Sequence, residues 1–199
     1  LLGEGLPVSL TIGAWAMGLA IVIGTGLGMM AAVRQNTAAD YTAMGAAMVG
    51  ISIPTFVTGP FLSLVLGVYL NLFAAGGLDL GRMNFNNLFL PIVTLALPQI
   101  AIISRLMRAS MIESLRSNFV RTARAKGLSQ SRILWRHAAP AAILPVISYL
   151  GPATVGIITG SVVVERVFGL PGVGSSFIDG AMTRDYTRVM GAVILYGGL

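Results

Sequence analysis

Cysteine is absent from this 199-residue chain, and charged residues make up only 10% of it. Without cysteine there is neither a disulfide framework nor a thiolate metal site. The single histidine, His137, cannot form a metal site that needs several imidazole ligands. The single lysine, Lys126, precedes a glycine, so the phosphate-binding pattern GxxxxGK[ST] is missing. We therefore expect no metal site, no catalytic residue and no ATP or magnesium bound by this chain.

What the chain has in abundance is apolar sequence. Hydrophobic residues make up 55% of it and the mean hydropathy is +0.84, whereas a soluble domain carries about 25% charged residues. Glycine and proline recur inside the apolar runs, as membrane bundles tolerate. The composition predicts an all-α integral membrane protein, a polytopic helical bundle in the lipid bilayer. The formal net charge of +6 is concentrated locally, which favours membrane orientation over nucleic-acid binding.

Apolar runs predict four spans and the start of a fifth, because about 20 residues cross a bilayer core. Glycines 24, 26 and 28 in the first run predict close packing against another helix. Pro54 and Pro60 predict a kink in the second run. The hydroxyls beside them either line a pathway or bond back to their own helix, and we favour the second interpretation. The predicted spans cover residues 6–33, 41–72, 88–112, 143–164 and 189–199.

Positive charge predicts the orientation of these spans. Loops 34–40 and 105–137 share one side and hold nine Lys and Arg residues, against four in loops 74–87 and 165–188. The first side is therefore expected to be cytoplasmic. Arg105 and Arg108 end the third span, where we expect them to anchor it at the membrane interface. Leu1 is not an initiator methionine and Leu199 lies in an apolar run, so we expect a fragment of a longer protein.

The cytoplasmic loop, residues 113–140, contains a short predicted helix, Phe119–Lys126. Asn118 is its candidate N-cap, and Gly127 is the candidate left-handed residue after its end. A helix of this length is unstable alone in water. We therefore expect neighbouring spans or a partner protein to hold it.

The outer connection, residues 165–188, carries the sequence GLPGVG, which lacks the lysine of a phosphate loop and is predicted to be a structured turn. Carboxylates at span centres would indicate a proton relay. Here they are expected only in loops or near span ends, which argues against a proton-coupled carrier: Asp40, Asp79, Glu113, Glu165, Asp179 and Asp185.

The cytoplasmic loop resembles the signature loop of ABC-importer permease subunits, EAA-xxx-G-x9-I-x-L-P. Gly127 and Pro140 match its glycine and proline at the correct spacing, and Ala123 matches its second alanine. Four positions depart from the pattern: Arg121 for Glu, Thr122 for Ala, His137 for Ile and Ala139 for Leu. Further stretches are similar to the dipeptide and oligopeptide (DppB/OppB-like) group: LPVSLTIG, SIPTF, VRTARAKGL, ILPVISYLGP, ERVFGLPGVG and DYT.

The resemblance implies the type I importer permease architecture of six spans, of which this chain would hold about five, in a single transmembrane permease domain over residues 1–199. It implies a multi-pass protein of the bacterial inner membrane that imports peptides by alternating access. Implied partners are a second permease subunit, two ABC ATPase subunits that bind ATP and magnesium, and an extracytoplasmic solute-binding protein. Implied ATPase-docking residues are Phe119, Val120, Arg121, Thr122, Ala123, Arg124, Ala125, Lys126, Gly127 and Pro140.

Two alternatives remain open at this point. Permeases for nickel and glutathione resemble the same group, and no residue identifies a substrate-binding position. An ion-coupled secondary carrier is the second alternative, since it would work without ATPase partners.

Overall fold

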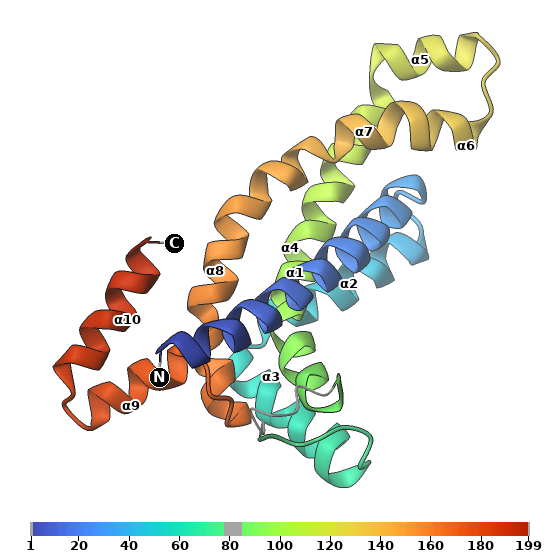
Figure 1. The fold of residues 1–199 in the computed structure, drawn as a ribbon. Coiled ribbons are helices and arrows are strands. Elements are labelled where there is room, and N and C mark those ends of the chain that lie inside the picture. Colours follow the sequence, from blue (N-terminus) through green and yellow to red (C-terminus); the bar gives the residue numbers. More distant parts are fainter. Residues whose placement is uncertain (1, 78–84, 199) are drawn as a thin grey trace. The chain divides into compact units, whose positions relative to one another are not determined.

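The computed structural model describes residues 2–77 and 85–198, which form helices joined by turns (Figure 1). None of these described residues lies in a strand. The all-α prediction is therefore confirmed. In chain order, the elements are α1 (Leu2–Val33), α2 (Ala38–Ser52), α3 (Thr55–Leu62), the π-helical η1 (Ser63–Tyr69), α4 (Phe85–Arg116), α5 (Asn118–Ala125), α6 (Gln130–Ile133), the π-helical η2 (Leu134–Ala138), α7 (Ala139–Ala142), α8 (Leu144–Phe168), α9 (Val173–Met182) and α10 (Tyr186–Gly198).

Two compact units make up the chain. Unit 1 consists of Leu1–Gly18, Ile53–Ala96 and Ala153–Leu199, and unit 2 consists of Leu19–Ser52 and Leu97–Pro152. The long helices α1, α4 and α8 each run from one unit into the other in sequence. That residues 1–199 form a single transmembrane domain stays a prediction.

Unit 1 is built around the end of α8 and the turn that follows it. Phe168 and Leu170 are buried there, and Val8, Ile12 and Leu90 are further buried residues of unit 1. Gly59 of α3 allows the close approach of Val167 and Phe168, since a Cβ at Gly59 would lie 3.2 Å from Val167 Cγ1. The backbone N–H of Gly77 donates to the carbonyl of Phe168 at 2.8 Å, which ties the segment after η1 to the same turn.

Unit 2 is held together by close packing of α1 against α4. A Cβ at Gly24 would lie 2.8 Å from Ile103 Cγ2, and one at Gly28 would collide with the carbonyl oxygen of Ser104. Gly24 and Gly28 are four residues apart and lie on one helical face. Close packing is therefore confirmed for both of them. Gly26 is exposed with open space around it, so the expectation was wrong there.

Helix length and hydropathy are consistent with a membrane protein. Gly5–Val33 and Phe85–Arg116 are each long and apolar enough to cross a bilayer. The number of candidate spans among the described residues rises to five if each of three bent helix pairs is one span. Large apolar side chains such as Trp15, Val22 and Phe61 are exposed in both units, as is compatible with lipid or protein neighbours.

In the second apolar run the helix is interrupted where a kink was predicted. Pro54 precedes α3, and the helix that ends at Ser52 begins again only at Thr55. The hydroxyl of Ser52 donates to the carbonyl of Met48 at 2.9 Å, and that of Thr58 donates to the carbonyl of Pro54 at 3.2 Å. The interpretation that these hydroxyls bond back to their own helix is therefore confirmed for Ser52 and Thr58.

The loops contain more helix than hydropathy indicated. The predicted basic loop, residues 113–140, holds the end of α4, the elements α5, α6 and η2 and the start of α7, and the connection of residues 165–188 holds α9. Glu165 lies inside α8 and is buried, so its assignment to the start of a loop was wrong. A prediction from hydropathy places the end of a span at the first charged residue. The helix itself can continue past that residue where the charged side chain has hydrogen-bond partners. Leu1, Asp79, Arg82 and Leu199 lie outside the described residues.

Candidate functional site

Helix α5 begins one residue earlier than the sequence indicated. Ser117 adopts an extended conformation in the N-cap position, and Asn118 is the first helical residue. The prediction of Asn118 as N-cap was therefore wrong. No side-chain hydrogen bond caps α5, because the Ser117 hydroxyl donates backwards to the carbonyl of Ser114 at 2.6 Å.

The end of α5 is defined by hydrogen bonds around a glycine. Gly127 has a φ of +74°, so the predicted left-handed conformation is confirmed. Its N–H donates to the carbonyl of Arg124 at 2.9 Å, and the N–H of Leu128 donates to the carbonyl of Ala123 at 3.3 Å. This pair of bonds is the Schellman arrangement, which satisfies carbonyls that the helix leaves free. The chain can therefore reverse direction into α6.

Helix α5 has one buried face and one exposed face. Val120 and Ala123, three residues apart, are buried where α5 packs on α6 and η2. Both were expected to offer apolar contact to a partner, but they are not accessible in this structure, since the chain's own neighbours cover them. The exposed positions are Phe119, Arg121, Thr122, Arg124, Ala125, Lys126 and Gly127.

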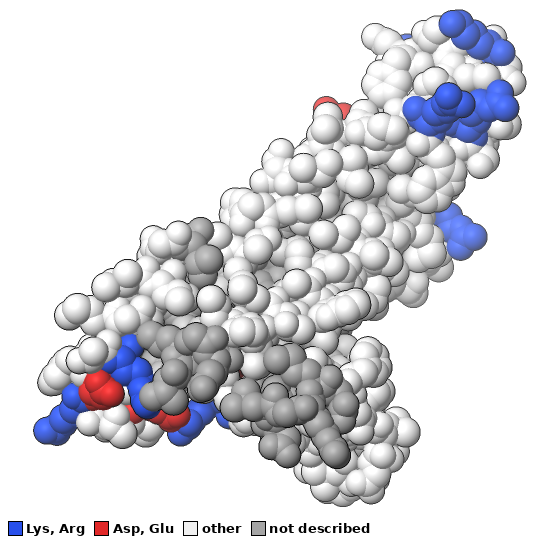
Figure 2. Space-filling view, viewed as in Figure 1, with Lys and Arg blue, Asp and Glu red and all other residues white. Residues whose placement is uncertain are grey.

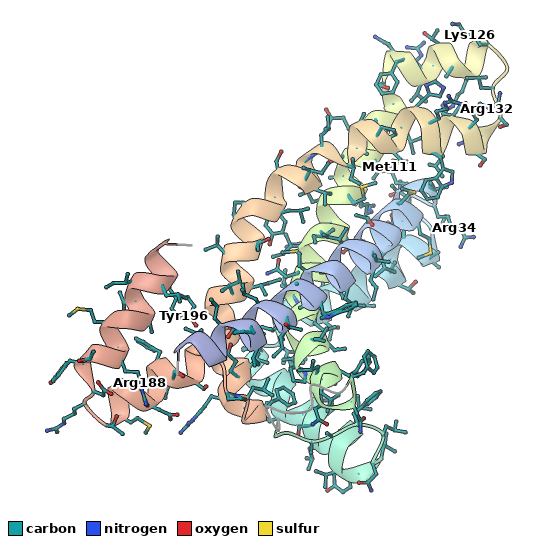
Figure 3. All side chains as sticks on the ribbon, viewed as in Figure 1. Arg34, Met111, Lys126, Arg132, Arg188 and Tyr196 are labelled. Atoms are coloured by element: carbon teal, nitrogen blue, oxygen red, sulfur yellow. The ribbon has the colours of Figure 1, made fainter. Side chains whose placement is uncertain are left out.

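The exposed face of α5 is basic and carries an aromatic side chain. Figure 2 shows Lys and Arg side chains gathered over the α5–α6 hairpin, and Figure 3 shows the side chains of Lys126 and Arg132 at its far end. Phe119 is 47% exposed, and Trp135 of η2 is also exposed. Helix α5 ends at Ala125, one residue before the predicted end, and Lys126 is its C-cap residue. We call the exposed residues from Phe119 to Lys126 the α5 surface. Pro140 lies in α7 and is exposed, outside this helix.

Polar contacts connect the end of α4, which carries α5, to the turn between α1 and α2. Arg108 forms a bidentate pair with Asp40, with its Nε and Nη2 each 2.6 Å from a carboxylate oxygen. Asp40 also accepts from the backbone N–H of Asn36 at 2.9 Å, and Arg116 Nη2 donates to Gln35 Oε1 at 3.1 Å. Arg108 therefore has a partner within the chain that the predicted anchor role did not include, while Arg105 is exposed. Sequence reasoning missed this pair because its members lie 68 residues apart.

The glycine-rich turn between α8 and α9 is structured, as predicted. The N–H of Leu170 donates to the carbonyl of Glu165 at 2.8 Å, and Gly169 has a φ of +63°. The Glu165 carboxylate accepts from the N–H groups of Gly174 and Ser175 at the start of α9. The donors that a phosphate would need at this position are therefore already used.

A polar cavity of about 270 Å³ lies against this turn. At its edge, Arg166 pairs with Asp179 at 2.8 Å, and both side chains are about half exposed. No group of three or more His, Asp or Glu residues suited to a metal occurs in the described part of the chain. The lining residues are Glu165, Arg166, Gly169, Leu170, Pro171, Ser175 and Asp179.

The all-helical architecture and the exposed basic hairpin agree with a known family. The chain belongs to the family of binding-protein-dependent transport system inner membrane components, whose model matches residues 24–199. Among curated relatives, the oligopeptide transport system permease protein OppB of Salmonella typhimurium is 51% identical over 199 residues, and OppB of Haemophilus influenzae is 49% identical over the same length. The dipeptide transport system permease protein DppB of Bacillus subtilis is 41% identical over 196 residues.

These relatives are longer than this chain. The alignments cover 100% of the chain but 64% of each OppB protein, and 98% of the chain but 62% of DppB. A crystal structure of an amino acid ABC transporter with histidines has a similar fold, with a TM-score of 0.74 over 98% of this chain and 85% of that chain. Its 18% identity supports the fold alone. The resemblance to the DppB/OppB-like permease group is therefore confirmed.

Proposed function

We propose that this chain is the greater part of a permease subunit that imports oligopeptides or dipeptides across the bacterial inner membrane by alternating access. The observation that carries the proposal is its 51% identity, over its whole length, to the oligopeptide permease OppB. The candidate spans support a multi-pass topology. Energy would come from separate ATPase subunits, because the chain has no phosphate-binding lysine motif.

The proposed partners follow from the family and the exposed surfaces. A second permease subunit would complete the pathway, two ABC ATPase subunits would bind at the cytoplasmic face, and a solute-binding protein would deliver cargo from outside. The family description itself refers to binding-protein-dependent transport. Nickel or glutathione import by a permease of the same group is the nearest alternative, and an ion-coupled secondary carrier is the more distant one.

The α5 surface is the proposed docking site for an ATPase subunit. It combines one exposed aromatic side chain, Phe119, with the charges of Arg121, Arg124 and Lys126. Aromatic and arginine side chains commonly dominate binding energy at protein interfaces. Gly127 and Pro140 would contribute by shaping the hairpin, and Val120 and Ala123 by holding α5 against it. Rigid displacement of such a hairpin is one way to transmit ATPase closure to attached helices.

Transport by the reconstituted complex tests the proposed function. The full-length permease, its partner permease, the ATPase subunits and the binding protein would be placed in liposomes, and uptake of a labelled peptide measured. We expect uptake only when ATP and magnesium are supplied on the side of the membrane that carries the ATPase subunits. Uptake without ATP and without ATPase subunits would establish the secondary-carrier alternative instead. Uptake of Ni²⁺ or glutathione in preference to peptides would establish the corresponding permease.

Charge reversal on α5 tests the docking surface. Arg121→Glu combined with Phe119→Ala is expected to weaken co-purification of the ATPase subunits by at least about tenfold, because an anchor is lost and a like charge faces an acidic partner. Membrane insertion should stay unchanged. Arg34→Glu is the matched control, since Arg34 is exposed in the turn before α2 and lies outside α5. Equal ATPase recovery from both variants would contradict the docking role.

A further inference from the structure

Unit 1 contains a buried carboxylate that has no part in the proposed docking of an ATPase subunit on the α5 surface. Glu165, near the end of α8, is 1% exposed. Within the described residues it has no cationic partner, while the neighbouring Arg166 pairs with Asp179. A buried charge is costly unless it is paired or fully hydrogen-bonded. The hydrogen bonds of Glu165 therefore decide why it is tolerated there.

Each carboxylate oxygen of Glu165 accepts two hydrogen bonds. Oε1 accepts from the hydroxyls of Ser9 at 2.7 Å and Ser161 at 2.8 Å, and the Ser161 hydroxyl shares its one hydrogen with the carbonyl of Ile158 at 2.7 Å. Oε2 accepts from the backbone N–H groups of Gly174 at 2.8 Å and Ser175 at 3.1 Å. The two N–H groups belong to the first turn of α9, where a helix leaves its N–H groups without internal partners. The carboxylate therefore caps α9 from a different helix.

The Ser9 hydroxyl extends this contact to α1. Its oxygen accepts from the backbone N–H of Val173 at 3.0 Å, so three successive N–H groups of α9 are satisfied by Glu165 and Ser9 together. Ser9 and Ser161 are both buried. We call Glu165, Ser9 and Ser161 the α9 anchor. It joins the beginning of α1, the end of α8 and the beginning of α9 within unit 1.

Glycines make room for the α9 anchor. A Cβ at Gly172 would collide with the Glu165 carboxylate, and a Cβ at Gly5 would lie 2.8 Å from the carbonyl carbon of Gly172. A Cβ at Gly174 would likewise collide with Val162 of α8. The turn is thus packed around the carboxylate with no space for a side chain at Gly172. In a close-packed interior such contacts are rigid, so small displacements are transmitted.

From this geometry we infer that Glu165 is a positioning residue for the transport cycle. This inference rests on the proposed function. Its carboxylate fixes α9 to the end of α8 and to α1, so that the three segments move as one body. Helix α8 follows directly on the α5–α7 hairpin in sequence. Displacement of that hairpin by an ATPase subunit would then reach α9 only if the α9 anchor is intact.

Two measurements on the full complex test this inference. Glu165→Gln keeps the shape of the side chain but replaces one acceptor oxygen with an amide donor, and Glu165→Ala removes all four hydrogen bonds. We expect amide hydrogen exchange over residues 173–176 to become at least about tenfold faster in Glu165→Ala, because hydrogen bonds to charged groups are among the stronger ones. We expect an intermediate increase in Glu165→Gln. Peptide uptake should fall by at least about tenfold in Glu165→Ala, while ATPase subunits still co-purify.

Asp179→Asn is the matched control, because Asp179 is a half-exposed carboxylate on α9 itself and pairs with Arg166. It should leave exchange at 173–176 unchanged. Ser161→Ala removes one of the four hydrogen bonds and serves if Glu165→Ala fails to insert; it should raise exchange by a few-fold. Wild-type exchange in Glu165→Gln and Ser161→Ala would overturn the anchor, and wild-type uptake alongside faster exchange would overturn its role in transport. Failure of the wild-type complex to import peptide would overturn the proposed function, while the exchange measurement would still decide the anchor.

Discussion

Replacing Arg108 with alanine is expected to lower the free energy of unfolding of the permease by about 3 kcal/mol, because removal of one partner leaves a buried charge unpaired. The buried partner is Asp40, at 1% exposure, whereas the side chain of Arg108 is 27% exposed. After Arg108→Ala, the bond from the backbone N–H of Asn36 is the side-chain hydrogen bond that Asp40 keeps among the described residues. Thermal unfolding of the full-length permease in detergent, followed by tryptophan fluorescence, measures the effect.

The same pair predicts an asymmetry between its two members. Asp40→Ala should cost less than Arg108→Ala, because the guanidinium can turn toward solvent or lipid headgroups. The double variant should be more stable than Arg108→Ala alone, since neither charge is then left buried without a partner. Arg105→Ala, three residues earlier on the same helix and exposed, should change stability by less than about 0.5 kcal/mol. Equal losses in the variants of Arg105 and Arg108 would show that the ion pair does not stabilise unit 2.

Gly28→Val is expected to destabilise the permease by about 3 kcal/mol, because the valine side chain would force α1 away from α4. The obstacle includes backbone: a Cβ at Gly28 would collide with the carbonyl oxygen of Ser104 and lie 3.0 Å from the backbone nitrogen of Arg108. Backbone of a helix cannot turn aside as a flexible side chain can. The displacement would also disturb the Arg108–Asp40 pair, which adds to the loss.

Gly26→Val is the matched control for this substitution. Gly26 lies on the same helix only two residues away, and a Cβ there would meet no atom within 4 Å. Valine has a higher helix propensity than glycine, so this variant should be neutral or slightly stabilising. Comparison of the two thermal transitions measures the difference directly. If Gly28→Val unfolds at the same temperature as Gly26→Val, close α1–α4 packing does not contribute to stability.

The α5 hairpin illustrates how far local sequence signals reach. A left-handed glycine after a short helix could be predicted, because the conformational freedom of Gly127 and the helix C-terminus are local properties. The start of the helix was missed by one residue, since Ser117 and Asn118 are both good N-cap residues. Which face of α5 is buried could not be predicted. It depends on the return of the chain through α6 and η2, which cover Val120 and Ala123.

Helix α9 illustrates the opposite case. Its sequence is short, contains Ser175, Ser176 and Asp179, and overlaps GLPGVG at its start, which indicates a turn and no span. Its first turn is stabilised from outside by the Glu165 carboxylate, nine residues earlier, and by Ser9, 164 residues from Val173. Local propensity contains no information on such a cap. The only available signal was a single glutamate next to an apolar run, which hydropathy interprets as the end of a span.

Composition and the distribution of charge are enough to predict a helical membrane protein with a basic loop between two of its spans, because each of these properties depends on residues close together in sequence. The motifs in that loop are enough to indicate the permease family. Two pairings required the folded chain: Arg108 with Asp40 across 68 residues, and Glu165 with Ser9 across 156 residues. Polar partners this distant meet only where helix packing brings them together, and a pattern of apolar residues specifies that a face is buried without specifying what lies against it.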